Sequence, residues 1–271
     1  MLCNQRFPTS WSTGRPLPAA RLLSVLSVVF LLGTPVRAQT IQESTHSFRL
    51  EGENIAMQCF APAKDGQHPA VLLLHGSEGM KDERIYRYIA HILAEDGYVA
   101  LIVHYFDRTA TKCIEPKDIN EKLFEAWKET VRQAVLQAAR LPGVDDKHIG
   151  LLGFSLGAYL SLAVATQADV PIAAVADFFG GLPEKLQAKA KSLPPTLIVH
   201  GDADQTVPVQ EALTLEKLLR QHKRTFETKI YAGQDHLFKS KWFSPDVRDA
   251  HDRTLAFFAK HLKPRSVVRG P

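Results

Sequence analysis

The chain has 271 residues, of which 45% are hydrophobic, 23% are charged and 8% are aromatic, and these proportions exclude a collagen-like, low-complexity or wholly disordered protein. The formal net charge is +4, but four of the 33 basic residues lie within residues 1–38, which contain no acidic residue. The other 29 basic residues balance 29 acidic ones, so the composition favours no nucleic-acid partner.

Residues 1–38 have the pattern of a secretory signal peptide. Basic residues precede an uncharged run over 22–32, and the sequence TPVRA follows at 34–38. This order is typical of exported proteins, so we expect cleavage after Ala38. A membrane-spanning helix needs roughly 20 apolar residues, so we expect no stable membrane anchor after cleavage. The expected product is a secreted or periplasmic domain over residues 39–271.

Strands and helices alternate along the rest of the chain. Apolar runs closed by turn residues predict strands over 70–76, 98–106, 148–154, 172–181, 195–202 and 225–233, after a hairpin over 48–62. Apolar residues at helical spacing predict helices over 82–96, 118–140, 156–167, 208–222 and 246–262. Strands that are apolar on both faces are typical of a parallel sheet between helices, which predicts a single, doubly wound α/β domain.

The strongest motif is Gly153-Phe154-Ser155-Leu156-Gly157, which fits the pattern G-x-S-x-G between a predicted strand and a predicted helix. A sharp strand–turn–helix leaves no room for side chains two residues before and after the serine, and glycines leave that space empty. The serine hydroxyl then projects at a helix N-terminus, which favours developing negative charge. The pattern predicts Ser155 as a nucleophile; an idle serine in a glycine-bounded turn is the alternative.

A nucleophilic serine needs a base, and the base needs an acid that orients it. In this fold class, the acid lies on a loop after a later strand. Asp204 follows the predicted strand over 195–202 and precedes a helix, so we expect it to be the acid. Asp202 could instead brace the turn, and Asp177 after an earlier strand is a third candidate.

His236 is the expected general base, because it lies on a loop directly after the last predicted strand. His200 ends a strand, where a buried histidine with satisfied hydrogen bonds is the more common finding. The remaining downstream histidines fall in predicted helices: His222, His251 and His261.

An oxyanion hole requires two backbone N–H donors beside the serine. The glycine-rich turn His75-Gly76-Ser77-Glu78-Gly79 follows the first predicted parallel strand and exposes such donors. We expect one donor to be the Ser77 amide and the other the Leu156 amide, while the His75 and Ser77 side chains hold the turn in shape.

Five motifs in this order resemble the dienelactone hydrolase family of α/β-hydrolases over residues 48–262. They are HGSEG at 75–79, HYFDR at 104–108, GFSLG at 153–157, HGDADQTVP at 200–208 and DHLF at 235–238. The resemblance implies the α/β-hydrolase fold with a sheet of about eight strands, no cofactor, no metal, and hydrolysis of ester or lactone bonds. It also implies Ser155, Asp204 and His236 as the catalytic triad.

The chain departs from this family at the nucleophile and beside the glycine-rich turn. Dienelactone hydrolases proper carry cysteine where this chain has Ser155, which favours a more general carboxylesterase. Their substrate-binding arginine matches Arg108, which implies that Arg108 binds a substrate carboxylate; the alternative is that Arg108 pairs with Asp107 or another loop acid. The family's glutamate after the third strand falls on Gly76, and Glu78 is not a secure substitute.

Two cysteines follow the leader, Cys59 and Cys113, and neither has a Cys or His partner at metal-ligand spacing. In the implied fold they lie toward opposite ends of the sheet, and a disulfide needs Cα atoms within about 7 Å. We therefore expect no bond between them.

Together these features predict an exported serine hydrolase that cleaves small-molecule carboxylic esters or lactones through an acyl-enzyme on Ser155. Two alternatives remain at this point: a serine peptidase of the same fold, and a non-catalytic binding protein on a hydrolase scaffold.

Overall fold

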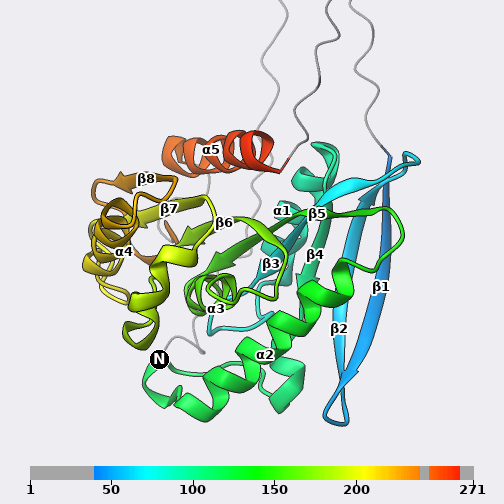
Figure 1. Ribbon diagram of the computed structural model, residues 1–271, viewed down its shortest axis with the longest axis horizontal. Coiled ribbons are helices and arrows are strands. Elements are labelled where there is room, and N and C mark those ends of the chain that lie inside the picture. The colour runs from blue at the N-terminus through cyan, green and yellow to red at the C-terminus, as the bar shows by residue number, and fades with distance from the viewer. Residues whose placement is uncertain (1–39, 239–243, 263–271) are drawn as a thin grey trace, which may run out of the picture.

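A computed structural model of the chain describes residues 40–238 and 244–262. The predicted signal peptide lies outside the described residues. Eight strands form one sheet with the order β1-β2-β4-β3-β5-β6-β7-β8 (Figure 1). They are β1 (Ile41–Leu50), β2 (Glu53–Pro62), β3 (His68–Leu74), β4 (Val99–Val103), β5 (Val144–Phe154), β6 (Ile172–Phe178), β7 (Thr196–Gly201) and β8 (Phe226–Tyr231). Only the β1–β2 and β2–β4 pairings are antiparallel, so the sheet is mostly parallel, as predicted.

Helices cover both faces of this sheet (Figure 1). The α-helices are α1 (Glu83–Glu95), α2 (Glu121–Ala138), α3 (Leu156–Ala165), α4 (Gln210–Gln221) and α5 (Pro245–His261). The 3₁₀ turns are η2 (Tyr105–Thr109), η3 (Pro116–Asp118), η4 (Glu184–Ser192) and η5 (His236–Phe238). Residues of α2, α3 and α4 share one core cluster, and residues of α1 and α5 share the other. The architecture is the predicted α/β-hydrolase fold.

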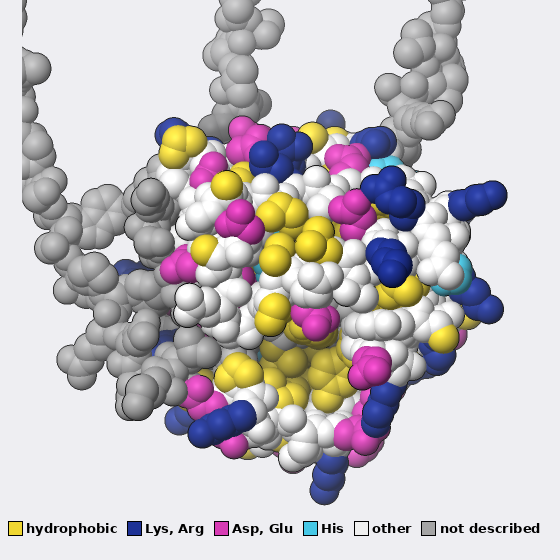
Figure 2. Space-filling model, turned by 90° about the vertical axis from the view of Figure 1, so that its left-hand side faces the viewer, with side chains coloured by type: hydrophobic (Ala, Val, Ile, Leu, Met, Phe, Trp, Pro, Cys, Tyr) yellow, Lys and Arg dark blue, Asp and Glu magenta, His cyan; other side chains and the backbone are white. Residues whose placement is uncertain are grey.

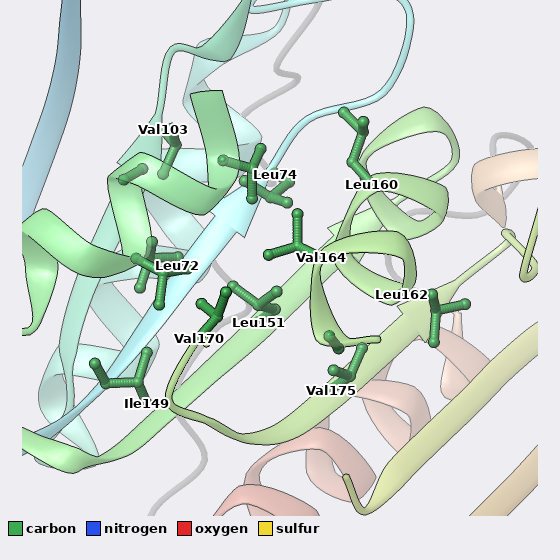
Figure 3. Packing of buried hydrophobic residues seen from close by; sticks show 14 of the residues in the cluster. Leu72, Leu74, Val103, Ile149, Leu151, Leu160, Leu162, Val164, Val170 and Val175 are labelled. Atoms are coloured by element: carbon green, nitrogen blue, oxygen red, sulfur yellow. The ribbon is translucent and has the colours of Figure 1, made fainter. Parts of the chain in front are cut away.

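The two clusters explain why the central strands are apolar throughout. Leu72 and Leu74 of β3 pack into the cluster beneath α3, while Val71 and Leu73 of the same strand pack beneath α1 and α5. Figure 3 shows Leu72 and Leu74 beside residues of β5, β6 and α3 in the first cluster. Side chains alternate along a strand, so burying both faces requires an unbroken apolar run. This core holds the carboxyl ends of the parallel strands in place.

The structure differs from the sequence prediction at the end of β4. The apolar run continues to Phe106, but the strand ends at Val103 and the chain turns into η2. Tyr105 and Phe106 are buried there against Trp127 of α2, with ring centroids 6.2 and 4.6 Å apart from it. A buried turn therefore has the same run of apolar residues in the sequence as a buried strand. The turn η4 was not predicted at all, and β1 begins further upstream than expected.

Cys59 of β2 lies opposite Leu101 of β4 and is a buried, free thiol, so it is not bonded to Cys113. Burial raises the pKa of this thiol. No helix within the described ranges is long and apolar enough to cross a membrane.

The face that carries β8 and α4 shows basic and acidic side chains interspersed, with hydrophobic side chains gathered in a hollow in its lower half (Figure 2). This face therefore carries no continuous patch of one charge sign.

Candidate active site

Ser155 lies between the end of β5 and the first residue of α3, with a backbone φ of 52°. A positive φ is strained for a serine, and such strain is found where function requires it. A Cβ added to Gly153 would lie 2.3 Å from the Gly157 carbonyl oxygen, and one added to Gly157 would lie 2.3 Å from the Leu74 carbonyl oxygen. Both positions exclude a side chain, which is the steric reason that the motif predicted.

Ser155, His236 and Asp204 form a hydrogen-bonded chain. The Nε2 atom of His236 is 3.0 Å from Ser155 Oγ, and its Nδ1 atom is 2.6 Å from Asp204 Oδ2. A carboxylate only accepts, so Nδ1 carries the hydrogen and the Nε2 lone pair faces the serine hydroxyl. The three residues follow β5, β8 and β7, and their side chains therefore meet at the carboxyl edge of the sheet.

The Asp204 carboxylate receives donors on both oxygens. Oδ1 accepts from the backbone N–H groups of Thr206 and Val207 at 2.8 and 2.9 Å, and Oδ2 lies 3.3 Å from His200 Nε2 as well as beside His236. Burial alone would raise the pKa of Asp204, but the hydrogen bonds from His200 and His236 hold it well below its usual value. Asp204 is therefore a carboxylate at neutral pH and can orient His236.

The other acids named from sequence occupy different places. The Oδ1 atom of Asp202 accepts from the Gly233 backbone N–H at 2.6 Å, so this residue braces the turn after β8. Asp177 is fully buried at the end of β6 and does not contact His236 through any hydrogen bond in the described structure. His222 ends α4, and His251 and His261 lie in α5.

Several buried contacts hold the glycine-rich turn after β3. The Tyr105 hydroxyl donates to the His75 carbonyl oxygen at 2.7 Å, and the Ile114 N–H donates to the Ser77 carbonyl oxygen at 2.8 Å. Burial lowers the pKa of His75 to about 3, so its ring is neutral where it stacks on Tyr105 with centroids 4.1 Å apart. The His75 side chain supports the turn, as predicted.

The start of α3 lies against this turn, because a Cβ on Gly157 would be 2.6 Å from the His75 carbonyl oxygen. Within the described part of the chain, neither the Ser77 nor the Leu156 N–H has a backbone or side-chain acceptor. An oxyanion hole requires two such donors beside the nucleophile. Their role as oxyanion donors stays a prediction.

A pocket of about 410 Å³ opens beside the same turn, lined among others by His75, Glu78, Phe106 and Lys112. Sequence reasoning did not single out Phe106 or Lys112 as site residues, although both lie on the loop that follows β4 at the carboxyl edge of the sheet. Glu78 folds over Gly76 and accepts a hydrogen bond from the Tyr86 hydroxyl at 2.6 Å. Among the described residues, no group of three or more His, Cys, Asp or Glu side chains could hold a metal ion.

Arg108 lies in η2, after β4, and its guanidinium donates to the Glu51 carboxylate in the turn between β1 and β2. Arg108 therefore pairs with an acid of a neighbouring loop, which was the alternative to substrate binding, and this acid is Glu51 rather than Asp107. Asp107 instead accepts from the Ala56 backbone N–H at 3.0 Å. Whether Arg108 also binds a substrate carboxylate stays a prediction.

Comparison with known proteins identifies the family of this chain. The sequence model described as "Dienelactone hydrolase family" matches residues 55–264. The chain belongs to the dienelactone hydrolase family. Membership in this family makes it a carboxylic ester hydrolase.

Two relatives in the comparison align with most of this chain. A "Probable 2-oxo-3-(5-oxofuran-2-ylidene)propanoate lactonase" from Bradyrhizobium is 25% identical over 80% of this chain and 94% of its own. A "Carboxymethylenebutenolidase homolog" from Xenopus tropicalis is 23% identical over 65% of this chain and 76% of its own. The solved structure of a thermostable esterase from Pseudomonas putida shares the fold, with a TM-score of 0.66, 17% identity and coverage of 83% and 84% of the two chains.

Replacing Arg108 with alanine separates its two possible roles. Because the guanidinium is engaged by Glu51, we expect the Michaelis constants for a monoester of a dicarboxylic acid and for a neutral ester of similar size to change alike. A selective increase of about tenfold or more for the acidic ester would show that Arg108 leaves Glu51 to bind a carboxylate. Steady-state kinetics on both esters distinguishes these outcomes, and Glu51→Gln is the control for loss of the ion pair alone.

Proposed function

We propose that the chain hydrolyses small carboxylic esters or lactones through an acyl-enzyme on Ser155. The observation that carries the proposal is the continuous set of hydrogen bonds from Ser155 Oγ through His236 to Asp204 Oδ2, at 3.0 and 2.6 Å. Membership in the dienelactone hydrolase family and the names of its lactonase and carboxymethylenebutenolidase relatives support hydrolysis of ester or lactone bonds.

In the acylation half-reaction, Ser155 Oγ attacks the ester carbonyl carbon while its proton moves to His236 Nε2. Nε2 can accept this proton because Asp204 holds the other hydrogen on Nδ1. The carbonyl oxygen gains negative charge and is stabilised by the Ser77 and Leu156 N–H groups. The C–O bond to the alcohol then breaks, and the alcohol leaves with the proton from His236.

In the deacylation half-reaction, water replaces the alcohol. His236 Nε2 removes a proton from the water as its oxygen attacks the acyl carbon, and the bond to Ser155 Oγ breaks. Ser155 recovers its proton from His236, and the carboxylic acid leaves. The Asp204 carboxylate stabilises the imidazolium that forms in both steps, which is why its low pKa matters.

The backbone at Ser155 argues against a non-catalytic role on this scaffold. A binding protein has no need for a serine at a φ of 52° that points at an oriented histidine. The complete hydrogen-bonded set therefore favours catalysis.

Ser155→Ala should lower the turnover of p-nitrophenyl acetate by about 10⁴-fold or more while leaving the circular dichroism spectrum unchanged. Ser161 of α3 is the matched control, since it is a buried serine whose hydroxyl donates to the Gly157 carbonyl oxygen at 2.8 Å and not to His236. Ser161→Ala should retain most activity. Wild-type turnover in Ser155→Ala would refute the proposal.

We also propose that the protein is exported, on the basis of the basic, apolar and small-residue pattern of residues 1–38. Expression of the whole chain in a Gram-negative bacterium should give a periplasmic protein whose N-terminal residue is Gln39. N-terminal sequencing of the periplasmic fraction measures this. An uncleaved chain in the cytosolic or membrane fraction would contradict the proposal, and a chain lacking residues 2–38 is the control that should remain in the cytosol.

A further inference from the structure

The backbone N–H of Ser77 can stabilise an oxyanion only if its peptide unit is held in a fixed orientation. A trans peptide unit is planar, and its N–H points in the direction opposite to its carbonyl oxygen. The Gly76 carbonyl oxygen belongs to the same unit, so its contacts set the direction of the Ser77 N–H. A donor that is oriented before the substrate binds needs no reorganisation during the reaction. The contacts that hold the turn after β3 therefore bear on catalysis.

Two donors hold the Gly76 carbonyl oxygen. The backbone N–H of Gly79 donates to it at 3.1 Å, and Nδ1 of His75 lies 2.8 Å from it. A carbonyl oxygen only accepts, so Nδ1 carries the hydrogen of the neutral His75 ring. In the next peptide unit, the Ser77 carbonyl oxygen accepts from the Ile114 N–H at 2.8 Å. The peptide units on both sides of Ser77 are therefore held in place.

Two buried tyrosines hold the preceding peptide unit, which joins His75 to Gly76. The Tyr105 hydroxyl donates to its carbonyl oxygen at 2.7 Å, and the Tyr86 hydroxyl accepts from its N–H at 3.2 Å. These two groups point to opposite sides of the chain, so the pair of hydroxyls fixes the rotation of the unit. Glycine has the widest choice of backbone conformations, and a turn that contains Gly76 depends on such restraints.

The Glu78 carboxylate orients the Tyr86 hydroxyl. A hydroxyl has one hydrogen, and Tyr86 donates it to Glu78 Oε1 at 2.6 Å, which leaves a lone pair for the Gly76 N–H. Burial and the Glu78 charge raise the pKa of Tyr86 well above its usual value, so the hydroxyl keeps this hydrogen at neutral pH. Glu78, Tyr86 and the Gly76 N–H thus form a continuous chain of hydrogen bonds.

The ring of Tyr86 is held as firmly as its hydroxyl. It lies edge to face against Phe154, which directly precedes Ser155, with centroids 5.8 Å apart, and against His75 at 6.3 Å. Tyr86 is 5% exposed, and a phenylalanine would supply the same packing. A buried hydroxyl is costly unless it is hydrogen-bonded, so its two bonds to the turn explain why a tyrosine can occupy this place in α1.

We propose that Tyr86, oriented by Glu78, positions the Ser77 N–H for the oxyanion by fixing the peptide unit between His75 and Gly76. The proposal rests on the reaction through Ser155 described above, with the Ser77 N–H as one of the two donors. Tyr86 acts through the backbone of Gly76, so it is a positioning residue. Glu78 acts through the Tyr86 hydroxyl. Without this hydroxyl the Gly76 N–H loses its acceptor, and the turn can rotate the Ser77 N–H away from the developing charge.

Tyr86→Phe tests the proposal, because it removes the hydroxyl and keeps the ring against Phe154. We expect kcat/KM for p-nitrophenyl acetate to fall about tenfold or more per active site. Active sites are counted from the amount of fluorophosphonate bound at completion, so unfolded protein does not lower the measured rate.

Two inhibitors separate positioning from a general loss of structure. A trifluoromethyl ketone adds to the serine and places a negative oxygen in the oxyanion hole, whereas the corresponding methyl ketone binds without forming this adduct. In Tyr86→Phe the inhibition constant of the trifluoromethyl ketone should rise by about the same factor as kcat/KM falls, and that of the methyl ketone should change less than about twofold.

Tyr98→Phe is the matched control, since Tyr98 is 0% exposed and directly precedes β4, at the edge of the sheet opposite the site. It should leave both inhibition constants unchanged. Glu78→Gln keeps an oxygen acceptor for Tyr86 and should retain most activity, whereas Glu78→Ala should weaken the trifluoromethyl ketone selectively. The double variant Tyr86→Phe/Glu78→Ala should be no slower than Tyr86→Phe alone, because Glu78 acts through the missing hydroxyl.

Wild-type kcat/KM in Tyr86→Phe, or equal weakening of the two ketones, would overturn the proposal. If Tyr86→Phe yields no folded protein, Glu78→Ala measured against Glu78→Gln makes the same comparison, and equal weakening of the two ketones there would overturn it too. Absence of both ester hydrolysis and fluorophosphonate binding in the wild-type protein would instead refute the proposed serine hydrolase function.

Discussion

The backbone between β5 and α3 turns so sharply that Gly157 touches the end of β3 and Gly153 touches Gly157. Added Cβ atoms at these two positions would lie 2.3 Å from the carbonyl oxygens of Leu74 and Gly157, far inside van der Waals contact. This close approach places Ser155 at a φ of 52° and directs its hydroxyl to His236. It also brings Gly157, in the first turn of α3, against the His75 carbonyl oxygen in the turn after β3. The positions of the nucleophile and of both predicted oxyanion donors therefore depend on one steric constraint.

The electrostatics of the site depend on a second feature, the number of donors around Asp204. A buried carboxylate is normally unfavourable, yet two backbone N–H groups and two histidine rings surround this one. The negative charge is thereby kept at neutral pH and oriented toward His236. The loop from Asp204 to Val207 supplies the backbone donors, which explains why an acid at this place in the loop can serve, whereas Asp202 two residues earlier only braces the neighbouring turn.

Much of this arrangement could be predicted from the sequence because it follows from local patterns. The glycines around Ser155 have a steric reason, and the acid after β7 and the histidine after β8 have a topological one. Each of these reasons can be read from a single sequence. The end of β4 was harder to predict from the sequence, because Tyr105 and Phe106 are as buried in a 3₁₀ turn as they would be in a strand. The contact of Arg108 with Glu51 depends on the β1–β2 hairpin lying beside the turn after β4, which no local pattern reveals. The hydrogen bonds of Tyr86 with Gly76 and Glu78 likewise depend on α1 packing against the turn after β3.

The central claim is that an acyl group passes through Ser155, and trapping that acyl group tests it most directly. The protein is mixed with p-nitrophenyl acetate, quenched in acid during turnover, digested and analysed by tandem mass spectrometry. For such activated esters deacylation is commonly the slower step, so the acyl-enzyme accumulates. The account predicts an acetyl group on Ser155 that disappears once the substrate is exhausted. Steady hydrolysis with no acetyl group on Ser155, or with the acetyl group on another residue, would contradict it.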